Sequence, residues 1–500
     1  RRRLIGGLDE SVPILYNDFT MIKFEPRPHQ QDMLWSMDMN DKGIVHCPVG
    51  GGKTYTFITD SRKYLIDNPI KTSCNESGSR VVVVVAPQLL LSNQLFKEFD
   101  KHLKDINFLW RQVSSESKTY ERDRQDLKFR VVPPKSPTTI VEEIRDTYRI
   151  AQKVNKPLIL FTTYDSLNRI VSSMIPVDVV YYDEAHNATS SDNFNAVKYM
   201  SSHAKRNYFF TATPRYSTDY ASDLSGMNNT DVYGDIICKV DFNRLVEQGV
   251  IVKPKLHLMK SDADLDNQRE VDVNMKTIVE VVDHYENVFT ETENHKLLFC
   301  AQGTQSIQDL LTSPQFIEFT TQRGYKVLSI DSVNQGYVDG QKKVSKTTFI
   351  DHLHSIGNNP HQKMIVLHYA MLGEGIDVKS FTGVVFLRKS MASIFANQSI
   401  GRVIRATPGK PYGVVTVVQH ESDTGESREI VKSIVKSLIE VGVPPEYFIS
   451  EDEEGRVIDS EVVQNLDQDH RTIIRDIAIR FEHSNMLAKL LEMDMEEISF

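Results

Sequence analysis

Three short segments, far apart in the chain, carry residue types that suit one reaction. Residues 47–54 (CPVGGGKT) form a glycine-rich run that ends in Lys53 and Thr54. In such a loop, backbone N–H groups surround phosphates, the lysine reaches the outer phosphate oxygens, and the hydroxyl holds Mg²⁺. Residues 183–186 (DEAH) supply carboxylates for the metal and for the attacking water. These two segments predict a site that hydrolyses a nucleoside triphosphate.

The third segment, residues 398–405 (QSIGRVIR), supplies positive charge for the same reaction. Its spacing places Arg402 and Arg405 on one side of a predicted helix, available to neutralise charge as the γ-phosphate leaves. A basic helix face that only helps folding would have the same local sequence. The three segments in this order favour an ATP-driven motor that acts on nucleic acid.

Each of these segments has neighbours that would hold it at the edge of a sheet. A short apolar run, residues 43–45, precedes the glycine-rich loop, and residues 55–65 can form a helix after it. Residues 177–182 are apolar apart from Asp178, which is typical of a buried parallel strand. Such a strand delivers Asp183 and Glu184 at its carboxyl end, where α/β sheets bind ligands.

The order and content of these segments resemble the superfamily-two helicases and translocases, in the DEAH-box branch that includes phage repair helicases and the motor subunits of restriction enzymes. The resemblance covers roughly residues 20–435. Further matching segments are residues 27–30 (RPHQ), Ala86-Pro87 with Gln94, residues 211–214 (TATP) and residues 372–377 (LGEGID). One departure is Cys47, where the family usually has Gly or Ala, and a cysteine is small enough to fit. The resemblance implies two RecA-like lobes with ATP between them.

The resemblance also implies a role for each matching residue. The implied ATP-binding residues are Gln30, which would read the adenine edge, and Gly50, Gly51, Gly52, Lys53, Thr54, Gly375 and Asp377. Thr54 and Asp183 would hold Mg²⁺, and Glu184 would deprotonate the attacking water. The implied catalytic set is Lys53, Glu184, Gln398, Arg402 and Arg405, the last three from the second lobe. Residues implied to grip nucleic acid or to couple it to ATP are Pro87, Gln94, Thr163, His186, Thr211 and Thr213.

Short Val- and Ile-rich runs alternate with longer amphipathic stretches through the middle of the chain, which predicts an α/β fold of parallel sheets flanked by helices. The first series of predicted strands is 43–46, 80–86, 158–162, 177–183 and 208–211, and the second is 296–300, 326–330, 363–367, 383–387 and 413–418. Two series predict two tandem RecA-like lobes, at residues 1–239 and 240–440, followed by a small acidic helical extension at 441–500.

Composition agrees with a globular chain of more than one domain, since 500 residues are too many for one core and 40% are hydrophobic. The cysteines Cys47, Cys74, Cys238 and Cys300 have no paired short spacing, which disfavours a zinc site or a disulfide framework and indicates a reducing compartment. The longest apolar stretch, residues 81–87, is far too short to span a membrane. We expect a cytoplasmic or nucleoid-associated protein that is not secreted, and its compactness resembles viral or phage enzymes.

The net charge of −10 is concentrated at the end of the chain. Residues 451–500 hold 14 acidic and 5 basic residues, a net of −9, which leaves about −1 for the first 450. Near-neutrality there permits a basic groove for nucleic acid on one face. For the acidic segment we favour a helical cap on the second lobe, with a protein-partner site as the alternative.

A second ambiguous segment is residues 107–157, inserted between two matching elements of the first lobe. We favour a helical decoration of that lobe. The alternative is a nucleic-acid arm that offers phosphate contacts and stacking faces. Its members would be Arg111, Lys118, Arg122, Arg124, Lys128, Arg130 and Lys135, spaced among Trp110, Tyr120 and Phe129.

Three classes of function stay open on the sequence. The leading one is an ATP-dependent DNA helicase or duplex translocase. An RNA helicase would use the same chemistry, because motifs that grip the backbone are shared between the two polymers. The third class is a nucleic-acid sensor or remodelling ATPase that does not separate strands.

Overall fold

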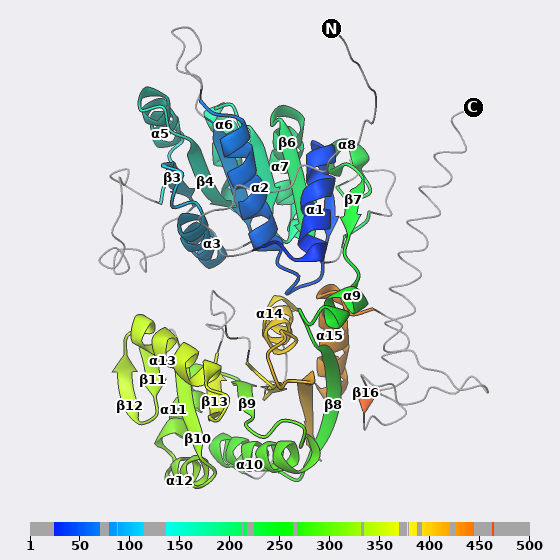
Figure 1. Ribbon diagram of the computed structural model, residues 1–500. Helices are drawn as coiled ribbons and strands as arrows, with labels where there is room; N and C mark the ends of the chain where they lie inside the picture. The colour runs from blue at the N-terminus through cyan, green and yellow to red at the C-terminus, as the bar shows by residue number, and fades with distance from the viewer. Residues whose placement is uncertain are drawn as a thin grey trace, which may run out of the picture.

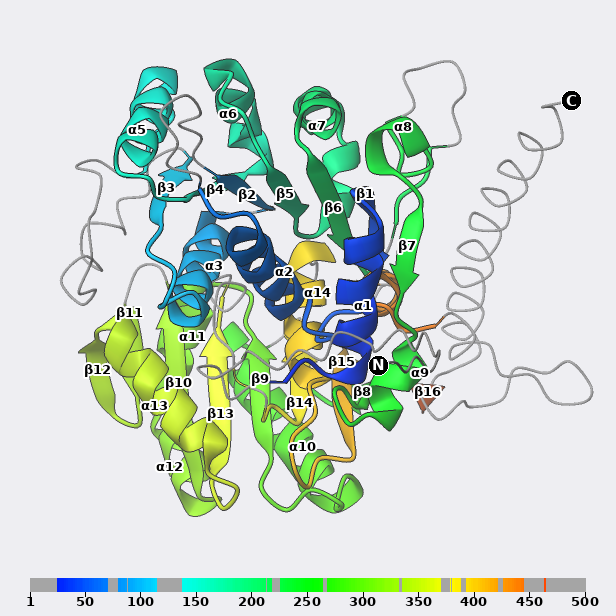
Figure 2. The same cartoon turned by 45° about the horizontal axis from the view of Figure 1, so that its top comes forward.

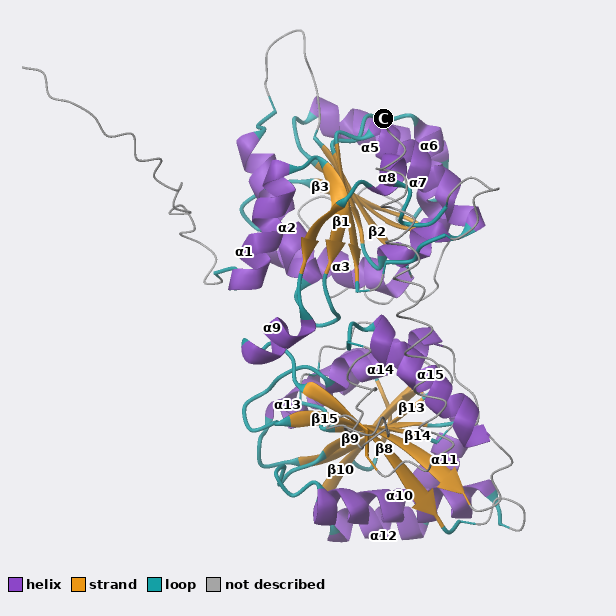
Figure 3. Ribbon diagram, turned by 90° about the vertical axis from the view of Figure 1, so that its right-hand side faces the viewer, coloured by secondary structure: helices purple, strands orange, loops and turns teal. Residues whose placement is uncertain are grey.

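The structure is a computed structural model in which the described residues are 25–70, 80–87, 89–114, 137–212, 214–217, 225–263, 268–331, 335–369, 378, 380–387, 393–420, 426–444 and 463–464. They form two α/β lobes, drawn one above the other in Figure 1. Each lobe has a sheet as its inner layer with helices on both faces (Figure 3). Among these residues, no helix is both long and apolar enough to cross a bilayer.

The first lobe contains a seven-stranded sheet in which every pairing is parallel. In spatial order its strands are β3 (Leu109–Val113), β4 (Leu158–Thr163), β2 (Val81–Ala86), β5 (Val179–Tyr182), β6 (Arg206–Thr211), β1 (Lys42–His46) and β7 (Ile236–Lys239). Its helices are α1 (Pro28–Met39), α2 (Lys53–Asp67), α3 (Leu89–His102), α5 (Val141–Lys153), α6 (Leu167–Ser173), α7 (Ser191–His203) and α8 (Thr230–Tyr233), with 3₁₀ turns η1 (Tyr164–Ser166) and η2 (Ala185–Thr189).

Strand β2 explains why this sheet is covered on both faces. All six of its residues are buried, because a continuous run of valines has no polar face to leave in water. Val82 and Val84 pack in the cluster that includes Phe57 of α2, while Val83 packs with Ile144 of α5 in the opposite cluster. Figure 2 shows α1, α2 and α3 on one side of the sheet and α5, α6 and α7 on the other.

The second lobe contains a nine-stranded sheet. In spatial order its strands are β12 (Gln341–Val344), β11 (Gln335–Val338), β10 (Tyr325–Asp331), β13 (Lys363–His368), β9 (Lys296–Cys300), β14 (Gly383–Phe386), β15 (Tyr412–His420), β8 (Lys253–Ser261) and β16 (Val463–Gln464). Its helices are α10 (Glu270–Val288), α11 (Thr304–Thr312), α12 (Pro314–Gln322), α13 (Lys346–Asn358), α14 (Ser393–Val403) and α15 (Glu426–Glu440). The short helix α9 (Phe242–Glu247) lies in the connection between the lobes (Figure 1).

The predicted α/β fold with two tandem parallel-sheet lobes is confirmed, and all ten predicted strands are present within a few residues. Between the predicted strands 326–330 and 363–367, the structure adds β11 and β12, which form an antiparallel hairpin that was not predicted. The proposed helical decoration is only partly right, since β3 is an edge strand of the sheet and α5 covers it. The domain boundary at Lys239 stays a prediction. The predicted acidic helical extension lies outside the described residues, apart from 441–444 and β16, which pairs with β8.

Candidate functional site

The glycine-rich loop follows β1 and leads directly into α2, which begins at Lys53. Gly50 and Gly52 have φ angles of +85° and +82°, a region that favours glycine. A side chain at Gly51 would meet Cys47 Sγ at 2.4 Å, so the loop is folded tightly on itself. The loop therefore brings backbone N–H groups and the start of a helix to one point, which is an arrangement that binds anions.

Lys53 at the start of α2 forms an ion pair with the acidic segment that follows β5. Its Nζ lies 3.0 Å from Glu184 Oε1, and the lysine is only 8% exposed. Asp183 is buried beside this pair, and its Oδ1 accepts a hydrogen bond from the Glu184 N–H at 3.1 Å. Glu184 has a φ of +47°, which is unusual for a residue with a side chain. The structure thus joins the two segments that the sequence predicted for phosphate and water.

The protonation of these groups follows from their mutual distances. Burial would lower the pKa of Lys53, but the carboxylates of Glu184 and Asp183 outweigh it, and the pKa is raised. For Glu184, burial would raise the pKa, and the attraction of Lys53 and His186 leaves it lowered. Burial and the neighbouring Glu184 raise the pKa of Asp183 to about 6. The site therefore holds a charged lysine against a charged glutamate.

Contacts also connect this site to the 211–214 segment at the end of β6. His186 Nδ1 lies 3.1 Å from Thr211 Oγ1, which fits the predicted coupling pair. His46, the last residue of β1, has its Nε2 2.8 Å from the carbonyl oxygen of Ala212. Burial lowers the pKa of His46 to about 4, so its ring is neutral and its Nε2–H donates. His46 was not among the predicted site residues, although its place directly before the loop was a usable signal.

The second lobe contributes helix α14 and the segment that follows it. Arg402 lies on the helix and is buried, with 7% of its side chain exposed. The prediction that Arg405 shares this helix is wrong, because α14 ends at Val403 and Arg405 pairs in an antiparallel bridge with Ile251. Pro408 and Gly409 follow closely, and neither favours a continuing helix.

The buried lysine Lys410 supports the segment that carries Arg405. Its Nζ donates to the Arg405 carbonyl oxygen at 2.7 Å. Burial and the nearby charge of Arg405 together lower the pKa of Lys410 to about 7. The Lys410 amine therefore helps to fix the backbone of Arg405, which also pairs with Ile251.

The two halves of the site are in direct contact. The Val49 N–H in the glycine-rich loop donates to the carbonyl oxygen of Val441, just after α15, at 3.0 Å. A Cβ atom on Gly401 of α14 would lie 2.7 Å from Val49 Cγ1, and one on Gly442 would lie 2.7 Å from Pro48 Cβ. Two glycines of the second lobe thus leave room for the loop of the first.

Gln30 in α1 lies against the glycine-rich loop. Its Oε1 accepts from the Arg27 N–H at 2.9 Å, and its Nε2 lies 3.4 Å from the Gly52 carbonyl oxygen. The adenine-reading role stays a prediction. Its neighbour His29, which sequence analysis quoted without assigning a role, is fully buried and contacts both Gly51 and Gln248.

The other predicted residues divide into three groups. Pro87 and Thr54 are half-buried, and Thr163 is buried at the end of β4. Gln94 and Gln398 lie in α3 and α14, but their side chains are outside the described part. Thr213, Gly375 and Asp377 lie outside the described residues, and their roles stay predictions.

Two residues of the proposed nucleic-acid arm, Trp110 and Arg111, are buried and do not offer contacts to nucleic acid. Arg111 is 4% exposed and pairs with Glu143 of α5, while Trp110 stacks on Phe96 with ring centroids 4.0 Å apart. Both residues belong to the core around β3. The remaining members of that set, at 118–135, lie outside the described residues.

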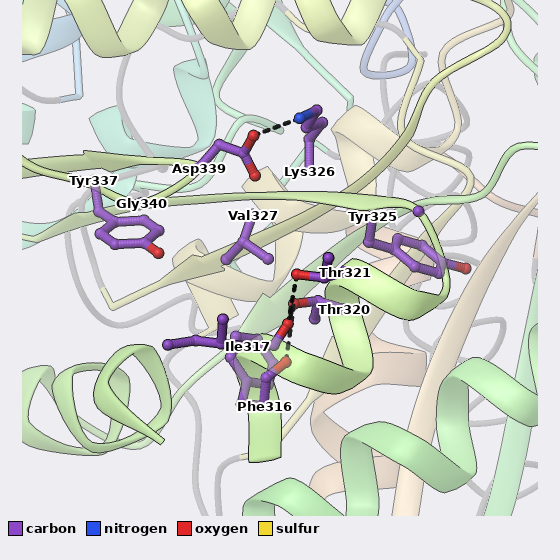
Figure 4. A pocket seen from close by; sticks show the side chains of 11 residues that line it. Phe316, Ile317, Thr320, Thr321, Tyr325, Lys326, Val327, Tyr337, Asp339 and Gly340 are labelled. Atoms are coloured by element: carbon purple, nitrogen blue, oxygen red, sulfur yellow. Dashed lines mark hydrogen bonds and ion pairs between the residues drawn. The ribbon is translucent and has the colours of Figure 1, made fainter. Parts of the chain in front are cut away.

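A hollow of about 340 Å³ lies on the second lobe between α12, β10 and the end of β11 (Figure 4). Its polar groups are engaged with each other. The hydroxyls of Thr320 and Thr321 donate to backbone carbonyls of their own helix, and Lys326 pairs with Asp339. The site at the glycine-rich loop is therefore the stronger candidate for chemistry.

Comparisons with known proteins agree with this geometry. Residues 23–216, which include the glycine-rich loop and the DEAH segment, match the model of the family described as Type III restriction enzyme, res subunit. The ATP-dependent Type ISP restriction-modification enzyme LlaBIII bound to DNA is similar in structure, with a TM-score of 0.62 and 18% identity over 91% of this chain and 32% of that one. The chain therefore shares the two-lobed α/β fold of this structure.

The same two-lobed fold is present in a second solved structure. This is a nuclease-deletion mutant of the Type ISP enzyme LlaGI in complex with a DNA substrate mimic, with a TM-score of 0.62 and 18% identity over 94% of this chain. The chain spans about a third of the length of either Type ISP structure, 32% and 33%. No curated protein matches the sequence closely enough to be called a relative.

Proposed function

We propose that this chain is an ATP-dependent motor on DNA, a helicase or duplex translocase whose hydrolysis of ATP drives movement along the polymer. The observation that carries the proposal is the Lys53–Glu184 ion pair, 3.0 Å long, in a loop whose Val49 also contacts the second lobe. A site that spans two lobes can convert a change in its ligand into a change in lobe arrangement.

In the proposed reaction, Lys53 leaves Glu184 and contacts the terminal phosphates of ATP. Glu184 is then free to orient the attacking water and to accept its proton. The lowered pKa of Glu184 while it is paired with Lys53 means that it is ionised before ATP arrives. A base that is already deprotonated can act as soon as the water is in place.

We also propose Mg²⁺ as the cofactor, within a DEAH-type site. The Thr54 hydroxyl, one residue after Lys53, and the buried Asp183 carboxylate are hard oxygen donors of the kind that Mg²⁺ prefers. When bound, the ion would neutralise charge on the β- and γ-phosphates. Asp183 would be held in place for this role by its hydrogen bond from the Glu184 N–H.

Arg402 and Arg405 are proposed to stabilise the charge that develops in the transition state. Arg402 lies one residue from Gly401, whose backbone approaches Val49 closely, so α14 is next to the phosphate loop. Arginines supplied by a second lobe act only when that lobe is correctly placed. This dependence would make hydrolysis sensitive to nucleic acid bound across the two lobes.

DNA is the proposed polymer because the family model is that of a restriction enzyme subunit and both Type ISP structures contain DNA. The deciding experiment measures ATPase rates with single- and double-stranded DNA and with RNA of the same sequence, using Lys53→Ala as the inactive control. Triplex displacement on duplex DNA then tests translocation, and strand displacement tests unwinding. We expect DNA to stimulate hydrolysis and triplex displacement to follow. Stimulation by RNA alone, or by neither polymer, would refute the proposal.

A further inference from the structure

The connection between the lobes touches both halves of the ATP site. On its second-lobe side, the Val252 N–H donates to the Ile404 carbonyl oxygen at 2.7 Å, and the Ala406 N–H donates to Val250 at 3.3 Å. These two bonds flank Arg405, whose backbone pairs with Ile251. Backbone pairing therefore ties the arginine-bearing segment to residues 250–252.

On its first-lobe side, the same connection reaches the phosphate loop. A Cβ atom on Gly50 would lie 2.9 Å from Ile251 Cγ2, and one on Gly51 would lie 3.2 Å from Leu245 Cδ1. Arg244 of α9 also forms an ion pair of 2.5 Å with Asp32 of α1. Helix α9 is thus packed between α1, the phosphate loop and the second lobe (Figure 1).

One polar relay crosses this contact. His29 Nε2 lies 2.8 Å from the Gly51 carbonyl oxygen, and His29 Nδ1 lies 2.7 Å from the position of Gln248 Oε1. A carbonyl only accepts, so Nε2 carries a hydrogen. In a neutral ring, Nδ1 then accepts from the amide NH₂ of Gln248, which the interchangeable positions of amide oxygen and nitrogen allow.

We propose that Gln248 is a positioning residue that holds the phosphate loop through His29, so that ATP affinity responds to the placement of the second lobe. The inference rests on the proposed function, because it concerns the same ATP site. His29 is completely buried, whereas Gln248 is exposed at the end of α9. The hydrogen bond from the exposed Gln248 to the buried His29 contributes little to the stability of the core. It fixes the orientation of the His29 ring, and the ring in turn fixes the Gly51 carbonyl.

The test replaces Gln248 by Met, which keeps its length and removes its hydrogen bond. The matched control is Glu247→Met, since Glu247 is also exposed on α9 and its side chain has no hydrogen bond or ion pair among the described residues. Affinity for a fluorescent ATP analogue is measured without DNA and with saturating DNA. One lost hydrogen bond predicts about a three- to tenfold weaker affinity for Gln248→Met and a smaller effect of DNA on it.

Two further variants separate a relay from a general loss of packing. Gln248→Lys retains a hydrogen-bond donor for His29 Nδ1 and should restore most of the affinity. In a double-mutant cycle with His29→Asn, the Gln248→Met change should have little further effect, because both changes break the same relay. The turnover number at saturating ATP should stay within about twofold of wild type, since a positioning residue acts on binding.

The relay would be overturned if Gln248→Met bound the ATP analogue as tightly as wild type and Glu247→Met do. Additive effects of His29→Asn and Gln248→Met would overturn it as well. These readouts do not depend on stimulation by DNA. Loss of the proposed motor function would appear separately, as a wild-type ATPase that no polymer stimulates.

Discussion

The Lys53 ammonium and the Glu184 carboxylate lie 3.0 Å apart. The group proposed to bind phosphate and the group proposed to activate water therefore form an ion pair with each other in this structure. Each group holds the other in its charged form. Bound ATP would compete with Glu184 for the lysine. Removal of the lysine should therefore weaken ATP binding, whereas removal of the carboxylate charge should not weaken it.

Lys53→Ala is expected to abolish detectable ATP binding, because the lysine contacts phosphate in the ground state. Glu184→Gln should bind ATP at least as tightly as wild type, since the lysine no longer leaves an ionised partner. Its hydrolysis should fall by about 10²- to 10⁴-fold, the usual contribution of a general base. Nucleotide affinity and turnover are measured for both variants. Turnover at the wild-type rate by the glutamine variant would remove Glu184 from the proposed mechanism.

Arg405→Ala is expected to reduce DNA-stimulated hydrolysis by about 10³-fold or more, as for a lost arginine finger. Basal hydrolysis and DNA binding should change much less. The melting temperature should be preserved, because Ile251 pairs with the backbone of Arg405 and alanine keeps that pairing. A joint fall in both rates and in the melting temperature would instead favour a structural role for this basic segment.

Gly401→Ala places a methyl group where Val49 Cγ1 lies 2.7 Å away. We expect the KM for ATP to rise about tenfold, since overpacking a tight contact costs about 1–3 kcal/mol. The stability of the second lobe should not fall, because alanine favours a helix over glycine. Gly303→Ala is the control, since a methyl group there meets nothing within 4 Å. Equal KM values for the two variants would contradict a tight contact between α14 and the loop.

Lys410 predicts a specific dependence of stability on pH. Its pKa is about 7 in the folded chain and 10.5 in its ordinary state, so between these values the unfolded chain binds a proton that the folded chain does not. The free energy of unfolding should therefore rise with pH from 7 to 10.5, and below pH 7 this contribution should be constant. Denaturant titrations across that range should show a smaller slope for Lys410→Met. An identical slope in the variant would contradict a neutralised buried lysine.

The strands of both lobes could be predicted because each is a short apolar run buried on both faces, as β2 is. The β11–β12 hairpin was missed because its sequence is largely polar. A usable signal was present, since Asp339 and Gly340 have φ angles of +43° and +96°, and Asp-Gly is typical of such a turn. Edge strand β3 was missed because it lies in a segment whose basic and aromatic residues suggested an arm.

The candidate site was predictable where its residues are neighbours in sequence, as in the loop and the DEAH segment. It was not predictable where partners come from distant elements. His29 and Gln248 are 219 positions apart, and no local pattern connects them. Arg405 has helical spacing from Arg402, yet its backbone pairs with the interlobe connection, because tertiary hydrogen bonds override a local preference.

Cys47, the first residue of the glycine-rich loop, gives the proposed ATPase an internal chemical probe. The thiol is fully buried, and burial raises its pKa to about 12, so it is almost wholly protonated and shielded near neutral pH. Alkylating reagents can reach it only when Gly51 moves away from the Cys47 sulfur, against which it now lies. The rate at which Cys47 is labelled would thus measure how often the loop opens. The reduction of that rate by bound nucleotide would measure how strongly nucleotide keeps the loop closed.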